Sequence, residues 1–444
     1  MTSVASGTGA WIVDLAGLRS SEPHVRGSVQ NLYRVERDGR TYLVADATDS
    51  GSAFDVGTFF TVPGSGRSRT ELRHAVFRRL ATPEAWRRLT RADLVACCGA
   101  DEGARLSDGS RLAELRSEGA ATHHVGLIDE ETGEVTSAFV PSAAVVVREH
   151  PVIKPEHFAY RGRPSWDYHR YQVATAKVLA LEHIFRLGSP AGSSIVERYR
   201  RALDAGGQRE ADAVAESAGV SGPITPWGRF EAMVYDCSTK YEDHDRYLGW
   251  QEAVHVCGVD HRVFLSVIEL LELCTVQVAT MFTSLGLGLW DIKWEAAVDG
   301  EDVVVVDTVD HDSVRITKDR VVEGRRCHFQ FNKQAIRDYY RILHPEWVSA
   351  LDHAKHRAEE DAGARTFRQI YDEGVGLGEY PPIPELDPVF TAIQGDKYDV
   401  VAAGTSGRVA PDLANERVES IADRELAYYE GRGRAGELLD HISG

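Results

Sequence analysis

Residues 289–295 read Leu-Trp-Asp-Ile-Lys-Trp-Glu, in which charged side chains alternate with bulky apolar ones. Successive side chains of a strand point to opposite faces, so we expect Asp291, Lys293 and Glu295 on one face. Trp290 and the apolar residues between them are expected on the other. An Asp-Gly pair at 299–300 predicts a turn, and the apolar run 303–306 predicts a return strand that ends at Asp307. The stretch therefore predicts a β-hairpin that carries several ionisable groups.

Carboxylates beside a lysine suit a magnesium–nucleotide site. Mg²⁺ prefers oxygen ligands and takes one or two carboxylates, with phosphates and water completing the octahedron. A lysine neutralises charge that develops on a transferred phosphoryl group. The same alternation also fits a strand with one solvent-facing side of mixed charge. These residues alone leave both interpretations open.

Turn residues and apolar spacing predict the other elements. Two β-prone runs about Asp38-Gly39 predict a hairpin, and a further strand is expected at 143–147. Helices are expected where apolar residues recur at helical spacing: at 70–95, in patches over 165–205, and at 261–285, 332–340 and 347–371. Polar composition predicts a surface loop at 101–118, an exposed connection at 206–222 and a peripheral segment after Val400.

The composition is that of an ordinary soluble protein, with 43% hydrophobic and 27% charged residues among 444. This length allows about two to three domains. We read no signal peptide and no apolar run of the roughly 20 residues that a spanning helix needs, so we expect a cytoplasmic protein without a membrane partner. The formal charge of −18 argues against nucleic-acid binding. The six cysteines form no C-x-x-C pair, which predicts reduced, packed thiols.

The decisive hairpin resembles the SAICAR synthetase family. Residues 288–295 resemble its D-x-K-[aromatic or Leu]-E signature after a Gly-Leu start, and residues 307–315 resemble its D-E-x-x-[ST]-P-D-x-S-R stretch. The resemblance implies that Glu295 and Asp307 bind Mg²⁺ and that Lys293 contacts a phosphate. It further implies that the substrate nucleotide is faced by Asp312, Ser313 and Arg315.

Other blocks of the family follow in the same order along the chain. They lie at residues 26–33, 48–55, 62–66, 181–193, 238–245 and 333–338. The resemblance implies that ATP is contacted by Arg26, Gly27, Ser28, Asp291 and Lys293. It implies that the substrates are contacted by Ser52, Asp55, Arg186, Gly192, Ser193, His244, Asp245 and Arg337. Lys240 joins Lys293, Glu295 and Asp307 as an implied catalytic residue.

The chain also departs from the family pattern at cationic and acidic positions. Ser28 and Gln30 stand where the glycine loop usually carries basic residues, and Ser65 stands at a lysine position. Thr308 replaces the acidic residue that usually follows the first aspartate of its block. These changes predict a divergent relative that acts on an analogous carboxylated heterocycle, such as one in nucleoside-antibiotic biosynthesis.

The resemblance implies an α+β fold with an antiparallel-sheet lobe at 1–150, a larger ATP-grasp or kinase-like lobe at 151–400 and an extension at 401–444. It implies an ADP-forming carbon–nitrogen ligase that uses ATP and Mg²⁺ to join L-aspartate to a ribonucleotide carboxylate. Family members commonly self-associate, so a homo-oligomer is also implied. The alternatives are a small-molecule kinase and a catalytically silent nucleotide-binding protein. Amine-dependent release of ADP separates the first from the ligase, and binding without turnover identifies the second.

Overall fold

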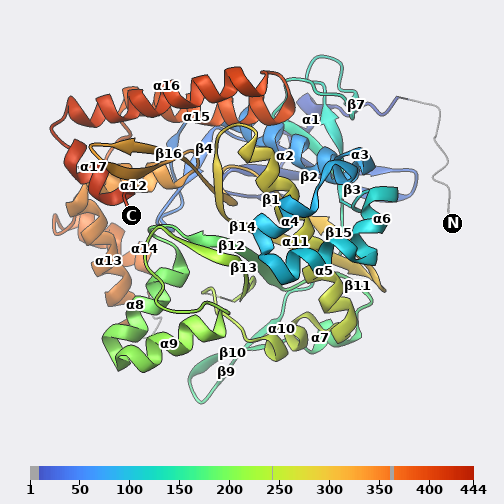
Figure 1. Ribbon diagram of the computed structural model, residues 1–444, viewed down its shortest axis with the longest axis horizontal. Coiled ribbons are helices and arrows are strands. Elements are labelled where there is room, and N and C mark those ends of the chain that lie inside the picture. The colour runs from blue at the N-terminus through green and yellow to red at the C-terminus, as the bar shows by residue number, and fades with distance from the viewer. Residues whose placement is uncertain (1–9, 243, 361–364) are drawn as a thin grey trace.

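A six-stranded antiparallel sheet forms the N-terminal part of the computed structural model, which describes residues 10–242, 244–360 and 365–444 (Figure 1). The strands follow the spatial order β1 (Val25–Arg26), β2 (Gln30–Arg37), β3 (Arg40–Ala47), β8 (Ala144–Arg148), β6 (His124–Ile128) and β7 (Val135–Thr136). Asp38 and Gly39 join β2 to β3 with φ angles of 52° and 71°, as a tight hairpin turn of this twist requires. The predicted hairpin and the strand at 143–147 are confirmed.

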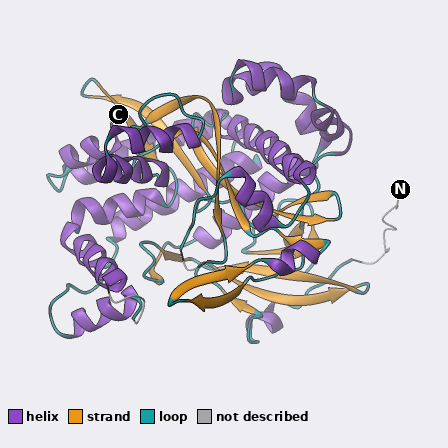
Figure 2. Cartoon of the chain, turned by 90° about the horizontal axis from the view of Figure 1, so that it is seen from below, coloured by secondary structure: helices purple, strands orange, loops and turns teal. Residues whose placement is uncertain are grey.

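A second, seven-stranded sheet carries the decisive hairpin. Its main path runs β13 (Gly228–Thr239), β12 (Leu181–Ser189), β14 (Gly288–Asp299), β16 (Val314–Val322) and β17 (Arg325–Gln330). Two further strands, β11 (Ala176–Val178) and β15 (Asp302–Val306), pair with β14. β15 returns antiparallel to β14 after the turn at 299–300, which confirms the predicted hairpin. Together with the helices, the two sheets give the expected α+β fold (Figure 2).

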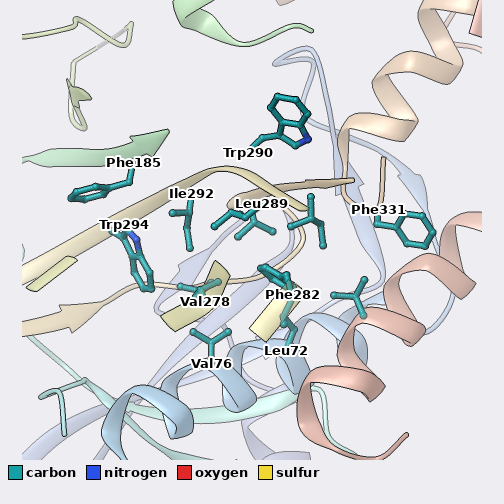
Figure 3. Close-up of a cluster of buried hydrophobic side chains, with 14 of the residues drawn as sticks. Leu72, Val76, Phe185, Val278, Phe282, Leu289, Trp290, Ile292, Trp294 and Phe331 are labelled. Atoms are coloured by element: carbon teal, nitrogen blue, oxygen red, sulfur yellow. The ribbon is translucent and has the colours of Figure 1, made fainter. Parts of the chain in front are cut away.

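β14 is buried on both faces, so the interpretation as a solvent-facing strand is wrong. Ile292 and Trp294 pack with Val278 and Phe282 of α11 (His261–Thr283), the long helix that the apolar stripe predicted (Figure 3). Trp290 differs from the prediction and projects from the other side of the strand (Figure 3). A β-bulge between residues 289 and 291 shifts the register there, and a bulge breaks the two-residue alternation.

α11 is the one described helix that is long and apolar enough to cross a membrane by length and composition. Two thirds of its apolar window, 67%, is buried inside the protein, where the helix lies against β14. Its stripe is therefore core, as predicted. The six cysteines are free thiols, five of them buried, and this also agrees with the sequence prediction.

Several helical boundaries differ from the prediction. The expected helix at 70–95 is three helices, α2 (Ser65–Ala81), α3 (Pro83–Arg88) and α4 (Arg91–Cys98), because Thr82 is extended before Pro83. The segment at 165–205 holds α7 (His169–Val173) and α8 (Ser194–Gly206), but β11 and β12 lie between them. The remaining predicted helices are α12 (Gln334–Leu343), α13 (Pro345–Glu360) and α14 (Phe367–Gly376). Residues 361–364 of the expected helix at 347–371 lie outside the described residues.

Three polar segments form helices, so their predictions as loop, connection and peripheral end are wrong. They hold α5 (Ala100–Asp108) with α6 (Ser110–Glu118), α9 (Gln208–Ser217), and α15 (Pro388–Ser406) with α16 (Pro411–Glu430) and α17 (Ala435–Ile442). Each helix buries one narrow apolar side, such as Leu106 in α5 and Ala211 in α9, beneath a polar surface. α15 lies against α2 and belongs to the main core. The division of the chain at residues 150 and 400 stays a prediction.

The other elements are short and lie around these sheets. They are α1 (Leu15–Arg19), β4 (Ser50–Ser52), β5 (Thr58–Thr61), β9 (Glu156–Tyr160), β10 (Arg163–Asp167) and α10 (Trp250–Cys257). β9 and β10 form an exposed hairpin that projects from the body (Figure 1).

Candidate active site

An acidic pair sits where the hairpin of β14 and β15 ends. Glu295 on β14 pairs in register with Val306, and Asp307 follows directly. Glu295 is 5% exposed, and burial together with the neighbouring Asp307 raises its pKa well above the usual glutamate value. Burial also acts to raise the pKa of Asp307, but the charge of Lys240 and a hydrogen bond from Glu295 outweigh it and lower that pKa. Burial and the close approach of the two carboxyl groups thus oppose the ionisation of both at once.

This donor set fits Mg²⁺. The Nζ of Lys240 forms an ion pair with Glu295, but a single ammonium leaves a second buried carboxylate beside it. Among the described residues no group of three or more His, Cys, Asp or Glu side chains could hold a metal. A magnesium ion bound with nucleotide phosphates needs only one or two carboxylates from the protein, because phosphates and water supply the remaining ligands. Glu295 and Asp307 would hold such an ion.

Asp307 has a left-handed backbone with a φ of 64°. Aspartate seldom adopts this conformation, which persists only where the surroundings hold it. The carbonyl oxygen of Asp307 accepts a 3.1 Å hydrogen bond from Nη2 of Arg73 and lies 2.8 Å from Nε2 of His123. Two buried side chains from other elements therefore fix the residue that ends the hairpin.

Lys293 and Asp291 occupy the same face of β14 as Glu295. Nζ of Lys293 lies 2.5 Å from Oε1 of Glu182 on β12. Oδ2 of Asp291 accepts hydrogen bonds from Arg315 at 2.6 Å and Arg186 at 3.4 Å. The charged face predicted from the alternation is confirmed, and each group on it has a partner of opposite charge.

These side chains line a cavity of about 250 Å³ beside β14. Five cations converge on it, namely Arg186, Lys293, Arg315, Lys333 and Arg337. The guanidinium of Arg337 hydrogen-bonds the neutral Gln334 at 3.2 Å, and in the described part of the chain no carboxylate lies within ion-pair distance of it. Burial, and then the charges of Arg315 and Arg341, lower the pKa of Arg337. Mutually repelling buried cations indicate a site for an anionic ligand.

The N-terminus of α8 borders this cavity through Ser194. Ser193 is the residue that precedes the helix, and its Oγ accepts a 3.1 Å hydrogen bond from Nη1 of Arg186. The carbonyl oxygen of Gly192, whose φ is 73°, accepts one from Arg315 at 3.3 Å. Helix N-termini favour anions through their free N–H groups and their dipole. Phosphate is therefore the ligand class that this end of the cavity suits best.

The loop between β15 and β16 closes the cavity. Oδ2 of Asp312 lies 3.8 Å from Nε of Arg69 and 3.9 Å from Nζ of Lys333. The hydroxyl of Ser313 donates to the carbonyl of Asp310 at 3.1 Å, which tightens the turn. Asp312, Ser313 and Arg315 all line the cavity, and their predicted contact with a substrate nucleotide stays a prediction.

Comparison with known proteins assigns the family. The model of the SAICAR synthetase family matches residues 23–353, which is most of the chain. The chain belongs to the SAICAR synthetase family. A curated protein of Archaeoglobus fulgidus, described as a phosphoribosylaminoimidazole-succinocarboxamide synthase, is 30% identical over 279 residues. The alignment covers 61% of this chain and 71% of that protein.

Solved structures of the family are more distant. The SAICAR synthase of Saccharomyces cerevisiae in complex with SAICAR is 16% identical, with 90% of this chain and 98% of that chain covered and a TM-score of 0.45. The enzyme of Ehrlichia chaffeensis is 10% identical, with 81% and 100% covered and a TM-score of 0.42. Membership of the SAICAR synthetase family makes the chain an ATP-dependent carbon–nitrogen ligase.

Some residues predicted from the SAICAR synthetase blocks lie away from the cavity walls. The glycine loop is exposed, and Arg26 forms a 3.5 Å ion pair with Glu22. Asp55 pairs with Lys355 at 2.8 Å. Asp245 lines the cavity, whereas the lining does not include Gly27, Ser28, Ser52, Gly192, Ser193 or His244. The functional roles of all these residues stay predictions.

Other residues of the site were not among the predictions. Glu182 and Lys333 lie within family blocks, but the sequence assigns no role to either of them. In the structure Glu182 forms an ion pair with Lys293, and Lys333 lines the cavity. Asp236 binds Arg186 at 3.1 Å from β13, a contact between strands that no local pattern reveals. Arg73 lies in the arginine-rich helix predicted at 70–95, and Arg69 lies one residue before that range, in the part of α2 that the prediction missed. Their spacing of four residues was the available signal that they share a face.

A larger cavity of about 710 Å³ lies between α2 and α15. Its charged lining is mixed, because Arg408 there binds Glu71 at 3.0 Å and also pairs with Asp399. It contains none of the residues predicted for the SAICAR synthetase site. The convergence of five cations, of which Arg337 has no carboxylate within ion-pair distance among the described residues, is more informative than volume, so we assign the active site to the smaller cavity.

Proposed function

We propose that the protein joins the amine of L-aspartate to the carboxylate of a heterocyclic ribonucleotide, with Mg–ATP converted to ADP and phosphate. The observation that carries the proposal is the acidic pair Glu295 and Asp307 lying on the same face of the same hairpin as the cation-lined cavity. The pair suits a metal–nucleotide centre and the cavity suits a phosphorylated substrate. Family membership supports ligase chemistry between the two.

In the proposed reaction the substrate carboxylate oxygen takes the γ-phosphoryl group of ATP and ADP leaves. The aspartate amine then attacks the acyl carbon, loses a proton and displaces phosphate. Mg²⁺ would neutralise charge on the transferring phosphoryl group, and the residues that would hold the ion are Glu295 and Asp307. Lys240 and Lys293 supply further positive charge on this face. Catalysis by positioning and electrostatics requires no nucleophile from the protein.

We assign the ribose 5′-phosphate of the substrate to the cationic end of the cavity. Arg186 and Arg315 are already oriented by Asp291, so their forks need little reorganisation when the phosphate binds. Arg337 contributes a third guanidinium. We assign the amine substrate to the side of Asp245, which lines the same cavity, with His244 adjacent in the chain.

The substrate heterocycle is carboxyaminoimidazole ribonucleotide or an analogue of it. Ser28, Gln30 and Thr308 depart from the family pattern, and they support an analogue in a specialised pathway such as nucleoside-antibiotic biosynthesis. We also expect the enzyme to act in the cytoplasm and to self-associate, as family members commonly do.

The test is ADP release by the purified protein with Mg–ATP, with and without carboxyaminoimidazole ribonucleotide and aspartate, followed by mass spectrometry. ADP release that needs both partners, with a new succinocarboxamide mass, supports the ligase acting on the purine intermediate. ADP release without any amine, with a phosphorylated product, would replace the ligase by a small-molecule kinase. Binding of Mg–ATP without turnover directs the assay to analogue carboxylates. No turnover with any carboxylate would overturn the proposal in favour of a silent nucleotide-binding protein.

A further inference from the structure

Arg73 is a buried cation without a carboxylate partner. Arg73 on α2 is 5% exposed, and it donates hydrogen bonds to the carbonyl of Asp307 at 3.1 Å and to Oε1 of Gln30 at 3.4 Å. Its Nη2 also lies 3.5 Å from Nε2 of His123. Its Nε has no hydrogen-bond partner. Within residues 10–242, 244–360 and 365–444, no ion pair joins Arg73 to a carboxylate. A buried charge is costly unless it is paired, so this arrangement calls for an explanation.

The position of Arg73 beside Asp307 explains why this charge is buried without a carboxylate partner. The Asp307 carbonyl that it binds belongs to the residue with the left-handed φ of 64°, immediately after β15. His123 approaches the same oxygen to 2.8 Å. Fixing the carbonyl of a residue in this conformation fixes the direction of its side chain, which here reaches Glu295. Arg73 thus acts on the acidic pair through a backbone hydrogen bond, and its charge also helps to lower the pKa of the Asp307 carboxyl group.

Gln30 links Arg73 to the glycine loop. It stands at the start of β2, at a position where the resemblance leads us to expect a basic residue, and Ser28 replaces a second one. In this chain the Gln30 amide oxygen accepts from Arg73 instead. The positive charge missing from the loop therefore lies beside the loop, on α2.

Arg69 repeats the arrangement one turn earlier. Residues four apart share a face of a helix, so Arg69 and Arg73 both point from α2 towards the loop at 307–312. Nε of Arg69 lies 3.8 Å from Oδ2 of Asp312, and its guanidinium lies over the ring of Tyr398. The face of α2 towards this acidic loop is therefore cationic at two successive turns.

We propose that Arg73 is a positioning residue of the metal–phosphate site, where it holds Asp307 in its metal-binding conformation and replaces the charge that the glycine loop lacks. This inference rests on the proposed Mg–nucleotide role of Glu295 and Asp307. It explains how a loop with Ser28 and Gln30 is compatible with nucleotide binding.

The test measures binding rather than turnover. The full-length protein is titrated with Mg–ADP by calorimetry, using the wild type, Arg73→Gln, and the double variant Arg73→Gln/Gln30→Lys. Arg73→Gln is expected to weaken Mg–ADP binding about tenfold or more, because hydrogen bonds to charged groups are worth about 1.5–3 kcal/mol and each 1.4 kcal/mol is tenfold. The added lysine is expected to recover much of this loss. A merely structural role of Arg73 would not be rescued by a lysine on β2.

Arg79→Gln is the matched control. Arg79 lies on the same helix, but its Nε donates to Gln277 at 2.9 Å, away from the acidic pair. Its variant should bind Mg–ADP as the wild type does. Equal affinities of the wild type and Arg73→Gln would overturn the inference, as would equal losses in the Arg73 and Arg79 variants.

Circular dichroism and thermal melting establish that each variant is folded. If Arg73→Gln does not fold, Arg73→Lys tests the inference instead. Lysine keeps the charge but lacks the planar guanidinium, whose two Nη groups bond Gln30 and Asp307. Arg73→Lys is then expected to bind Mg–ADP several-fold more weakly, and wild-type affinity would refute the inference. A wild type that does not bind Mg–ADP at all would instead refute the proposed function itself.

Discussion

Asp291 Oδ2 accepts a 2.6 Å hydrogen bond from Nη1 of Arg315, which is its direct neighbour across β14 and β16. The same oxygen accepts from Arg186 at 3.4 Å, on the other neighbouring strand. One carboxylate on the central strand therefore orients two guanidinium groups from both sides. This relationship explains why a charged face can be buried in the middle of a sheet: its members satisfy one another.

Arg315→Gln should weaken binding of the ribonucleotide substrate by about 10- to 100-fold, because a charged hydrogen bond to phosphate contributes about 1.5–3 kcal/mol. The loss should appear in the KM for the ribonucleotide and leave Mg–ATP binding unchanged. Steady-state kinetics at varied ribonucleotide concentration measures it. Arg320→Gln is the control on the same strand, since Arg320 forms its ion pairs with Glu419 and Asp423 instead. Equal KM values for both variants would remove Arg315 from the substrate site.

Glu295→Gln and Asp307→Asn should each lower the rate of ADP formation by about a thousandfold, the scale reported for loss of a preorganised electrostatic contact. Each substitution keeps the shape of the side chain and removes one metal-binding charge. ADP release that depends on both the ribonucleotide and aspartate measures the effect. Asp302→Asn, on the exposed start of β15, is the control within the same hairpin. Unchanged turnover in both site variants would mean that the acidic pair does not hold the catalytic metal.

The hairpin of β14 and β15 was predictable because its signals are local. Alternation of Asp291, Lys293 and Glu295 reports which side chains share a face, and Asp299-Gly300 reports the turn. The position of Trp290 was not predictable, since a bulge depends on the partner strand as much as on the sequence that carries it.

Contacts between distant segments were largely beyond sequence reasoning. Arg73 meets the Asp307 carbonyl across 234 positions of the chain, and nothing local to either residue signals the other. Glu182 and Lys293 meet across 111 positions for the same reason. The family blocks contain most of the residues that line the cavity. They do not reveal which of these side chains form ion pairs with one another, and those ion pairs determine the charge and orientation of the groups.

The segment after Val400 shows a different cause of error. Average polarity suggested a peripheral end, whereas α15 packs against α2 and α16 and buries small residues such as Ala402 and Ala403. Burial of small side chains adds little apolar signal to a sequence, although it permits close approach of two helices.

Metal binding should depend on pH through Glu295. Burial and the neighbouring Asp307 raise the pKa of Glu295, so at neutral pH a metal must displace a proton. The affinity for Mg–ADP should therefore increase as pH rises above the ordinary glutamate value of about 4.5 and level off once Glu295 is ionised in the free protein. Calorimetry in buffers of different ionisation enthalpy measures the released proton.

The stability of the metal-free protein should change with pH in the opposite direction to its affinity for Mg–ADP. A carboxyl group with a raised folded-state pKa stabilises the metal-free protein most at low pH, and this contribution is lost as pH rises through the folded-state pKa. Glu295→Gln should abolish both this part of the pH dependence and the proton release. Proton release that persists in Glu295→Gln would assign the titration to another group.

The last helices of the chain should be tied to the core by a buried ion pair. Nζ of Lys397 on α15 lies 2.6 Å from Oε1 of Glu425 on α16, and their side chains are 0% and 4% exposed. Glu425→Gln leaves a buried ammonium without its counter-charge and should lower the free energy of unfolding by about 3 kcal/mol. Lys397→Met combined with Glu425→Leu should recover most of that loss, since both charges are removed together. Chemical denaturation measures each value.

The same two helices offer a control at their surface. Arg424 of α16 pairs with Asp396 of α15 at 2.5 Å, with side chains 48% and 45% exposed. Arg424→Gln should cost less than about 1 kcal/mol, because solvent screens an exposed pair. Equal destabilisation by Arg424→Gln and Glu425→Gln would show that burial of the Lys397 pair has no special cost. A large difference would instead show that α16 unfolds together with the core, since only a group that stays buried until global unfolding contributes its full penalty.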